Sequence, residues 1–119
     1  MEVEHSFKKL TVWRKAYLFV LSIYKQTQKF PSSELYGLTS QVRRAVVSIL
    51  ANIVEGSERQ HKREFLQFLS IARGSLGEVE TYLMLAKDLG YIDEEKFIEL
   101  EGQRKKIGRL LRGLFRSLS

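Results

Sequence analysis

An apolar seam, spaced by alternating steps of four and three residues, crosses the middle of the chain. Its members all lie between residues 61 and 89: Phe65, Leu69, Ala72, Leu76, Val79, Leu83 and Ala86. These steps keep one face of an α-helix apolar, and heptad-like spacing is typical of helices that pack side by side at shallow angles. The seam therefore predicts a long helix over 61–89 within a helical bundle.

Three further segments show helical spacing of apolar residues, over 10–28, 38–55 and 94–118. The segments between them are short and hold the chain's single proline, Pro31. Short loops join antiparallel neighbours. We therefore expect an all-α fold, with residues 1–119 forming one antiparallel up-down-up-down four-helix bundle.

Several punctuating residues support these ranges. Gly56 and Ser57 follow the second apolar segment and predict its C-terminal stop, and Gly90 predicts a left-handed residue after the third. Asp93 is expected to cap the fourth helix. Trp13, Tyr17 and Tyr24 share one side of the first helix. Core packing explains these aromatics better than base stacking does.

Composition narrows the classes of function. The chain has no cysteine, which excludes disulfides and thiolate metal sites. No apolar run is long enough to span a bilayer, so we expect no membrane partner. The first residues lack the apolar core of a secretory signal, and a cytoplasmic location is the default expectation.

Enzyme chemistry has little support in the sequence. Its two histidines, His5 and His61, have no surrounding triad pattern, and no Glu-x-x-His motif of a di-metal bundle occurs. Glu55 and Glu78, on the two central helices, remain as a carboxylate pair that could approach and hold a metal, or else belong to a polar face. We expect no catalytic activity, no metal and no cofactor.

Positive charge concentrates near the C-terminus. The chain carries +6 overall, and residues 104–119 hold six basic and no acidic side chains. Helix geometry places four of the basic side chains within about 60° of arc: Lys105, Arg109, Arg112 and Arg116. Such a row suits a phosphate backbone, but it also suits a solvated helix face near a C-terminus. Further candidate nucleic-acid contacts are Arg43, Arg44 and Arg59.

The second helix has more apolar surface than one bundle needs. Four residues widen its apolar stripe to nearly half of the circumference: Val46, Val47, Leu50 and Val54. An arc this wide indicates burial against more than one neighbour. These residues are therefore the predicted interface of a homo-oligomer.

Several segments together resemble a known family. They are FKKLTVWRKA at 7–16, YGLTSQVRRA at 36–45, SILANIVEGSER at 48–59 and FLQFLSIARGS at 65–75. The combination resembles the four-helix bundle proteins encoded in 23S ribosomal RNA intervening sequences. The matching motif positions are Arg43, Arg44, Ser48, Asn52, Glu55, Gly56, Arg59, Phe65, Gly74 and Ser75. The family usually has Ala where Val54 stands, and often Pro where Leu50 stands.

The resemblance implies a ring-shaped homopentamer with no known catalytic activity. Family members are suspected of binding nucleic acid and are similar to the accessory protein of diversity-generating retroelements, which partners a reverse transcriptase. We therefore expect a basic, non-enzymatic homo-oligomer that binds RNA through its phosphates. The alternative is a protein-interaction scaffold, or an accessory subunit for a nucleic-acid enzyme such as a reverse transcriptase.

Overall fold

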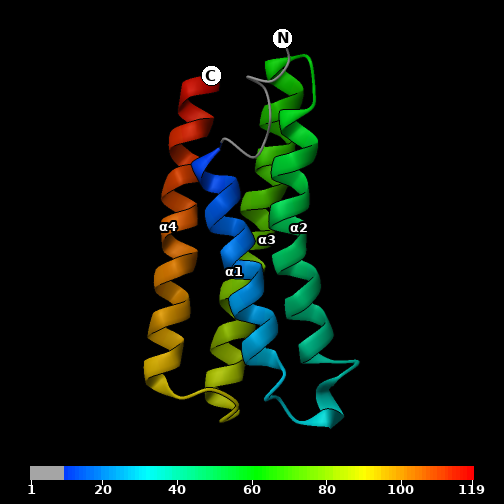
Figure 1. The fold of residues 1–119 in the computed structure, drawn as a ribbon, viewed down its shortest axis with the longest axis vertical. Coiled ribbons are helices and arrows are strands. Elements are labelled where there is room, and N and C mark those ends of the chain that lie inside the picture. Colours follow the sequence, from blue (N-terminus) through cyan, green and yellow to red (C-terminus); the bar gives the residue numbers. More distant parts are fainter. Residues whose placement is uncertain (1–9) are drawn as a thin grey trace.

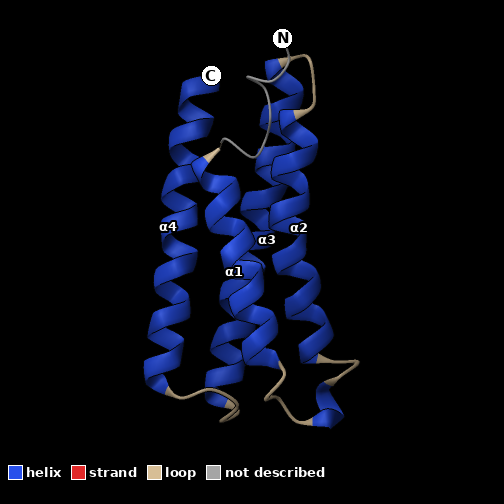
Figure 2. Ribbon diagram, in the orientation of Figure 1, coloured by secondary structure: helices blue, strands red, loops and turns tan. Residues whose placement is uncertain are grey.

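Four α-helices make up almost all of the computed structural model, which describes residues 10–119. A single 3-10 turn, η3, lies between the first two helices. The elements are α1 (Thr11–Thr27), η3 (Ser32–Glu34), α2 (Leu38–Ser57), α3 (Lys62–Asp88) and α4 (Glu94–Leu118). Figure 2 shows helices and loops, and no strand, over the described residues. The chain is therefore all-α, as its apolar spacing predicts.

The helices lie side by side along the long axis of the molecule, which measures 47 × 23 × 20 Å (Figure 1). Each helix packs against its neighbours in the sequence, and α1 also packs against α4. None of the described helices is long and apolar enough to cross a membrane.

The seam of α3 forms the centre of the core. Its residues from Leu69 to Ala86 are all buried, while Phe65 is half-buried at the end. The other helices contribute the remaining large side chains without solvent exposure: Phe19, Ile23, Ile49, Ile53, Ile107 and Leu111. The heptad-like spacing therefore predicted the buried face of α3 correctly.

The junction between α3 and α4 follows the local signals of the sequence. Gly90 has a φ of +84°, a conformation that glycine adopts without a side-chain clash. The N–H of Tyr91 donates to the Ala86 carbonyl at 2.8 Å, which completes a Schellman-type end to α3. Asp93 Oδ1 accepts a 2.7 Å hydrogen bond from the Lys96 N–H and so caps α4.

The helix α2 ends at Ser57, within the predicted Gly56–Ser57 stop, but Gly56 itself is a buried residue inside the helix and not the turn that ends it. A Cβ on Gly56 would lie 2.7 Å from Phe65 Cδ1 and 3.0 Å from Phe68 Cβ. The glycine is therefore required where α2 and α3 approach each other closely, rather than at a turn.

Burial also corrects two expectations about apolar side chains. Val46 was expected at an oligomer interface, but it is fully buried in the core of the bundle. Tyr17 and Tyr24 were expected in the core, yet they are 46% and 38% exposed. Sequence spacing assigns a residue to a helix face, but the positions of neighbouring helices decide whether that face is covered.

Candidate nucleic-acid interface

The row of cations on α4 lies on the surface of the bundle. Lys105, Arg109, Arg112 and Arg116 are all exposed, whereas Ile107 and Leu111 on the other side of the helix are buried. We call these four residues the basic row. Its geometry follows directly from the spacing of the residues on one helix.

The basic row keeps its positive charge. Among residues 10–119, no carboxylate oxygen lies within 4 Å of any of its four side-chain cations. Arg104, one residue before the row, differs because it binds Glu101 at 2.7 Å and Glu80 at 3.3 Å. The Glu101 carboxylate raises the pKa of Arg104 above its ordinary value. Acids of the bundle therefore pair with Arg104 but with none of the four cations of the basic row, among residues 10–119.

A groove of about 350 Å³ runs between α3 and α4 beside the basic row. It is lined by Arg73, Leu76, Gly77, Arg104, Lys105, Gly108, Arg109 and Arg112. We call it the α3–α4 groove. Arg73 belongs to α3, and its guanidinium carbon lies 5.5 Å from the centre of the Phe115 ring on α4. Arg73 was not among the predicted contacts, because only the packing of α3 against α4 brings it to the row.

The three other candidate cations lie away from the basic row. Arg43 Nε donates a 2.8 Å hydrogen bond to Thr27 Oγ1, and its guanidinium stacks 4.6 Å from the Tyr24 ring centre. These contacts attach α2 to α1. Arg59 forms a 2.6 Å ion pair with Glu55. Neither arginine is therefore a free cation like those of the row.

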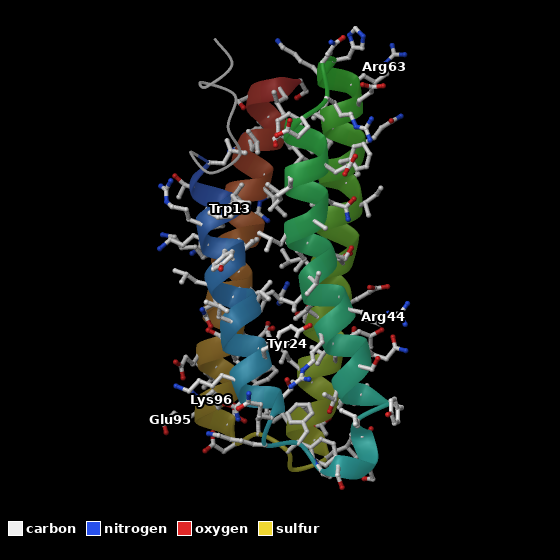
Figure 3. All side chains as sticks on the ribbon, turned by 45° about the vertical axis from the view of Figure 1, so that its right-hand side comes forward. Trp13, Tyr24, Arg44, Arg63, Glu95 and Lys96 are labelled. Carbon is white, nitrogen blue, oxygen red and sulfur yellow. The ribbon has the colours of Figure 1, made fainter. Side chains whose placement is uncertain are left out.

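Arg44 occupies a different surface, between α2 and α3. Figure 3 shows its side chain pointing outward from the bundle. It is exposed and borders a polar hollow of about 350 Å³ that Ser48, Ser75 and Glu78 also line. The structure therefore does not combine all seven predicted cations into one site.

An apolar surface covers the adjoining sides of α1 and α2. Tyr24 lies beside Arg43, and Figure 3 shows it between the two helices. Helical spacing places the other apolar side chains on the same sides of their helices. We define the α1–α2 apolar face by Tyr17, Leu21, Tyr24, Val47, Leu50 and Val54, each exposed or partly exposed.

Comparison with known proteins identifies the family. Residues 8–113 match the family of 23S rRNA-intervening sequence proteins. The chain belongs to this family. It is also similar to a crystal structure from Bacteroides thetaiotaomicron VPI-5482, described as a protein with unknown function from the S23 ribosomal protein family. The two share 25% identity and a TM-score of 0.81, over 88% of this chain and 95% of the other. No curated protein matches the chain.

In this member of the 23S rRNA-intervening sequence family, several of the motif residues connect α2 to α3. The Ser75 hydroxyl donates a 2.8 Å hydrogen bond to Ser48 Oγ, and Asn52 Nδ2 donates to the Ser48 carbonyl at 2.8 Å. Gly56 lies against Phe65. Gly74 is exposed and has open space around its Cα. Four of the ten motif positions, Ser48, Gly56, Phe65 and Ser75, therefore lie directly in the α2–α3 contact.

The same contact separates the two candidate metal-binding carboxylates. The Ser48–Ser75 hydrogen bond joins α2 to α3, and the Tyr82 hydroxyl on α3 donates to Gln41 on α2. Gln41 precedes Ser48 in the chain whereas Tyr82 follows Ser75, so the two helices are antiparallel. Glu55 and Glu78 then lie on opposite sides of the serine pair, ten residues or about 15 Å apart along the helix axes. The expectation that they could approach each other is wrong.

Proposed function

We propose that this family member is a non-enzymatic homo-oligomer that binds RNA through its phosphates in the cytoplasm. The protomer is an up-down-up-down four-helix bundle, and the assembly is the ring-shaped homopentamer that the family resemblance implies. One observation carries the proposal of binding: four exposed cations follow one face of α4 with no acidic partner among the described residues. A phosphate backbone is the polyanion that such a row fits best.

The energetics of this contact are electrostatic. Each phosphate neutralised by a cation releases condensed counterions. For single strands, each such contact makes the slope of log K against log salt concentration more negative by about 0.7. Four contacts per protomer therefore predict a slope near −3. The contacts read no bases, so affinity should depend little on sequence.

Self-association is supported by the α1–α2 apolar face. Leu21 is 53% exposed and Val47 39% exposed, and Tyr17 and Tyr24 of the same face are also exposed. Contiguous exposed apolar surface commonly marks an interface. Joining copies through this face leaves the basic row, on α4, available in each protomer and multiplies the positive charge of the assembly.

The test compares two quadruple variants that remove the same charge. The first replaces Lys105, Arg109, Arg112 and Arg116 with Gln, and the second replaces the exposed Lys25, Lys29, Lys62 and Arg63 with Gln. Binding to a structured RNA is measured by fluorescence anisotropy across a salt series. We expect the first variant to lose most of the affinity and the slope, while the second keeps them. Equal behaviour of the two variants, or no binding by the native protein at low salt, would refute the proposal.

A second candidate is an accessory subunit for a nucleic-acid enzyme such as a reverse transcriptase. The α1–α2 apolar face supports it, because the same surface can bind a different protein. A complex with a purified reverse transcriptase that survives nuclease treatment and is lost in Leu21→Glu would favour this candidate. A complex that dissolves on nuclease treatment would instead be held together by RNA.

A further inference from the structure

The geometry points to the α3–α4 groove as the binding site of a single RNA strand, whose phosphates contact cations on both helices. Arg73 contributes the wall on α3, and Lys105, Arg109 and Arg112 contribute the wall on α4. This inference rests on the proposed RNA binding and specifies the form of RNA and its path. It also adds a contact residue, Arg73, from a second helix.

The charge in the groove is unevenly balanced. Five cations line it, and the acids Glu101 and Glu80 both pair with one of them, Arg104. Within residues 10–119, the remaining four cations have no ion pair. The charge of Arg104 is thus balanced by carboxylates, although its side chain lines the groove. The other four cationic side chains attract the phosphates.

The floor of the groove is open because two of its lining residues, Gly77 and Gly108, have no side chain. A Cβ on Gly77 would meet no atom within 4 Å. Gly108 lies where α4 approaches α3. A Cβ added to Gly108 would lie 3.4 Å from Leu76 Cδ2 and 4.0 Å from the Arg112 guanidinium. Arg112 therefore extends beside an open floor, where its donors can reach a phosphate that enters the groove.

The size of the groove favours a single strand. Its volume of about 350 Å³ between two neighbouring helices has room for part of one phosphodiester chain but not for a double helix. A double helix is recognised across its grooves over many base pairs and would contact only the exposed side chains at the rim. Single strands commonly follow positively charged grooves.

Two leucine substitutions on α3 separate insertion into the groove from attraction to surface charge. Gly77→Leu fills the floor, and Gly74→Leu places the same side chain three residues away, outside the groove lining. Both glycines have open space for a side chain, and neither substitution changes the charge. Removing a helix-interior glycine should not weaken α3.

The measurement is binding of a labelled uridine oligonucleotide of about 12 nucleotides, beside a duplex RNA and a single-stranded DNA of equal length. We expect Gly77→Leu to weaken binding of the single-stranded RNA at least tenfold and to leave duplex binding unchanged, while Gly74→Leu changes neither. Equal binding by Gly77→Leu and the native protein, or equal losses in the two variants, would overturn the inference. Native affinity for single-stranded DNA or duplex that exceeds the affinity for single-stranded RNA would also overturn it.

A charge variant tests the wall on α3. We expect Arg73→Gln to reduce the magnitude of the salt slope by about 0.7, whereas Arg63→Gln, at the exposed start of α3, leaves it unchanged (Figure 3). An unchanged slope in Arg73→Gln would remove Arg73 from the site. The proposed function fails separately: it is refuted if the two quadruple variants bind RNA equally, or if the native protein binds no RNA at low salt, and neither result depends on Arg73 or Gly77.

Discussion

Arg104 and Glu101 form a two-pronged ion pair on α4. Arg104 Nε donates to Glu101 Oε2 at 2.7 Å, and a terminal nitrogen donates to Oε1 at 2.9 Å. Glu101 is only 7% exposed, so the pair is shielded from solvent at the edge of the α3–α4 groove. This pairing makes Arg104 part of the bundle's structure and leaves the rest of the groove positively charged.

Breaking this pair should change stability and RNA binding in opposite directions. Glu101→Gln removes the closer of the two carboxylates that balance Arg104, and we expect a loss of about 1 to 3 kcal/mol in the free energy of unfolding. The freed positive charge should tighten RNA binding at low salt. Glu99→Gln is the matched control, because Glu99 makes an exposed ion pair with Lys96 worth at most about 1 kcal/mol. Denaturant unfolding and anisotropy measure both effects; weaker RNA binding by Glu101→Gln would contradict this account.

The close approach of α2 to α3 at Gly56 predicts opposite results for two glycine-to-alanine changes. In Gly56→Ala the new Cβ would lie 2.7 Å from Phe65 Cδ1, and we expect destabilisation of about 1 to 3 kcal/mol. In Gly77→Ala the Cβ meets nothing, and the higher helix propensity of Ala should add up to about 1 kcal/mol. Thermal unfolding of both variants measures the difference. Similar stabilities of the two variants would show that α2 and α3 can move apart at Gly56 with little loss of stability.

The α1–α2 apolar face is the surface through which we propose that copies join. Leu21→Glu places a charge in the centre of this face, and burial of an unpaired charge is strongly unfavourable. We therefore expect the variant to dissociate into protomers that remain helical. Leu85→Glu, at an exposed leucine of α3, serves as the control and should leave the native mass unchanged. Light scattering gives the masses; an unchanged assembly in Leu21→Glu would place the interface elsewhere.

Glu34 links the start of α2 to the α3–α4 junction and predicts a pH dependence. Its carboxylate accepts hydrogen bonds from the Leu38 N–H at 3.0 Å and the Tyr91 hydroxyl at 2.8 Å. These bonds lower the pKa of Glu34 below its ordinary value of 4.5. A lowered pKa in the folded state means that the carboxylate stabilises the fold above pH 4.5, and that this stabilisation is lost as the pH falls through the lowered pKa.

The acid limb of unfolding tests this link. We expect Glu34→Gln to flatten the dependence of the melting temperature on pH below about 4.5. The exposed Glu58 provides the control, and Glu58→Gln should retain the native profile.

The Glu34 carboxylate also raises the pKa of Tyr91. The hydrogen bond from the Tyr91 hydroxyl therefore stabilises the fold fully below pH 10, and this stabilisation declines as the pH rises through the raised pKa of Tyr91. An alkaline limb of unfolding that is unchanged in Tyr91→Phe would show that the bond does not contribute to stability.

Local signals predicted the helices and their ends with little error. The expected ranges 10–28, 38–55, 61–89 and 94–118 differ from the observed helices by at most two residues. Spacing of apolar side chains, a left-handed glycine at Gly90 and a capping carboxylate at Asp93 all act within a few residues of the chain. The two-residue difference at the end of α2 arises because Gly56 contacts Phe65 and Phe68 of α3 from inside the helix and does not form a turn.

Sequence alone determined which side chains share a face of one helix. The basic row on α4 and the seam of α3 are examples, because helical rotation per residue fixes both without reference to other elements. Only the tertiary structure decided what covers or joins those faces: that Val46 is enclosed, that Glu101 and Glu80 neutralise Arg104, and that Arg73 stands beside the basic row. These outcomes depend on the register between separate helices, which the packing of whole surfaces sets and no single segment encodes.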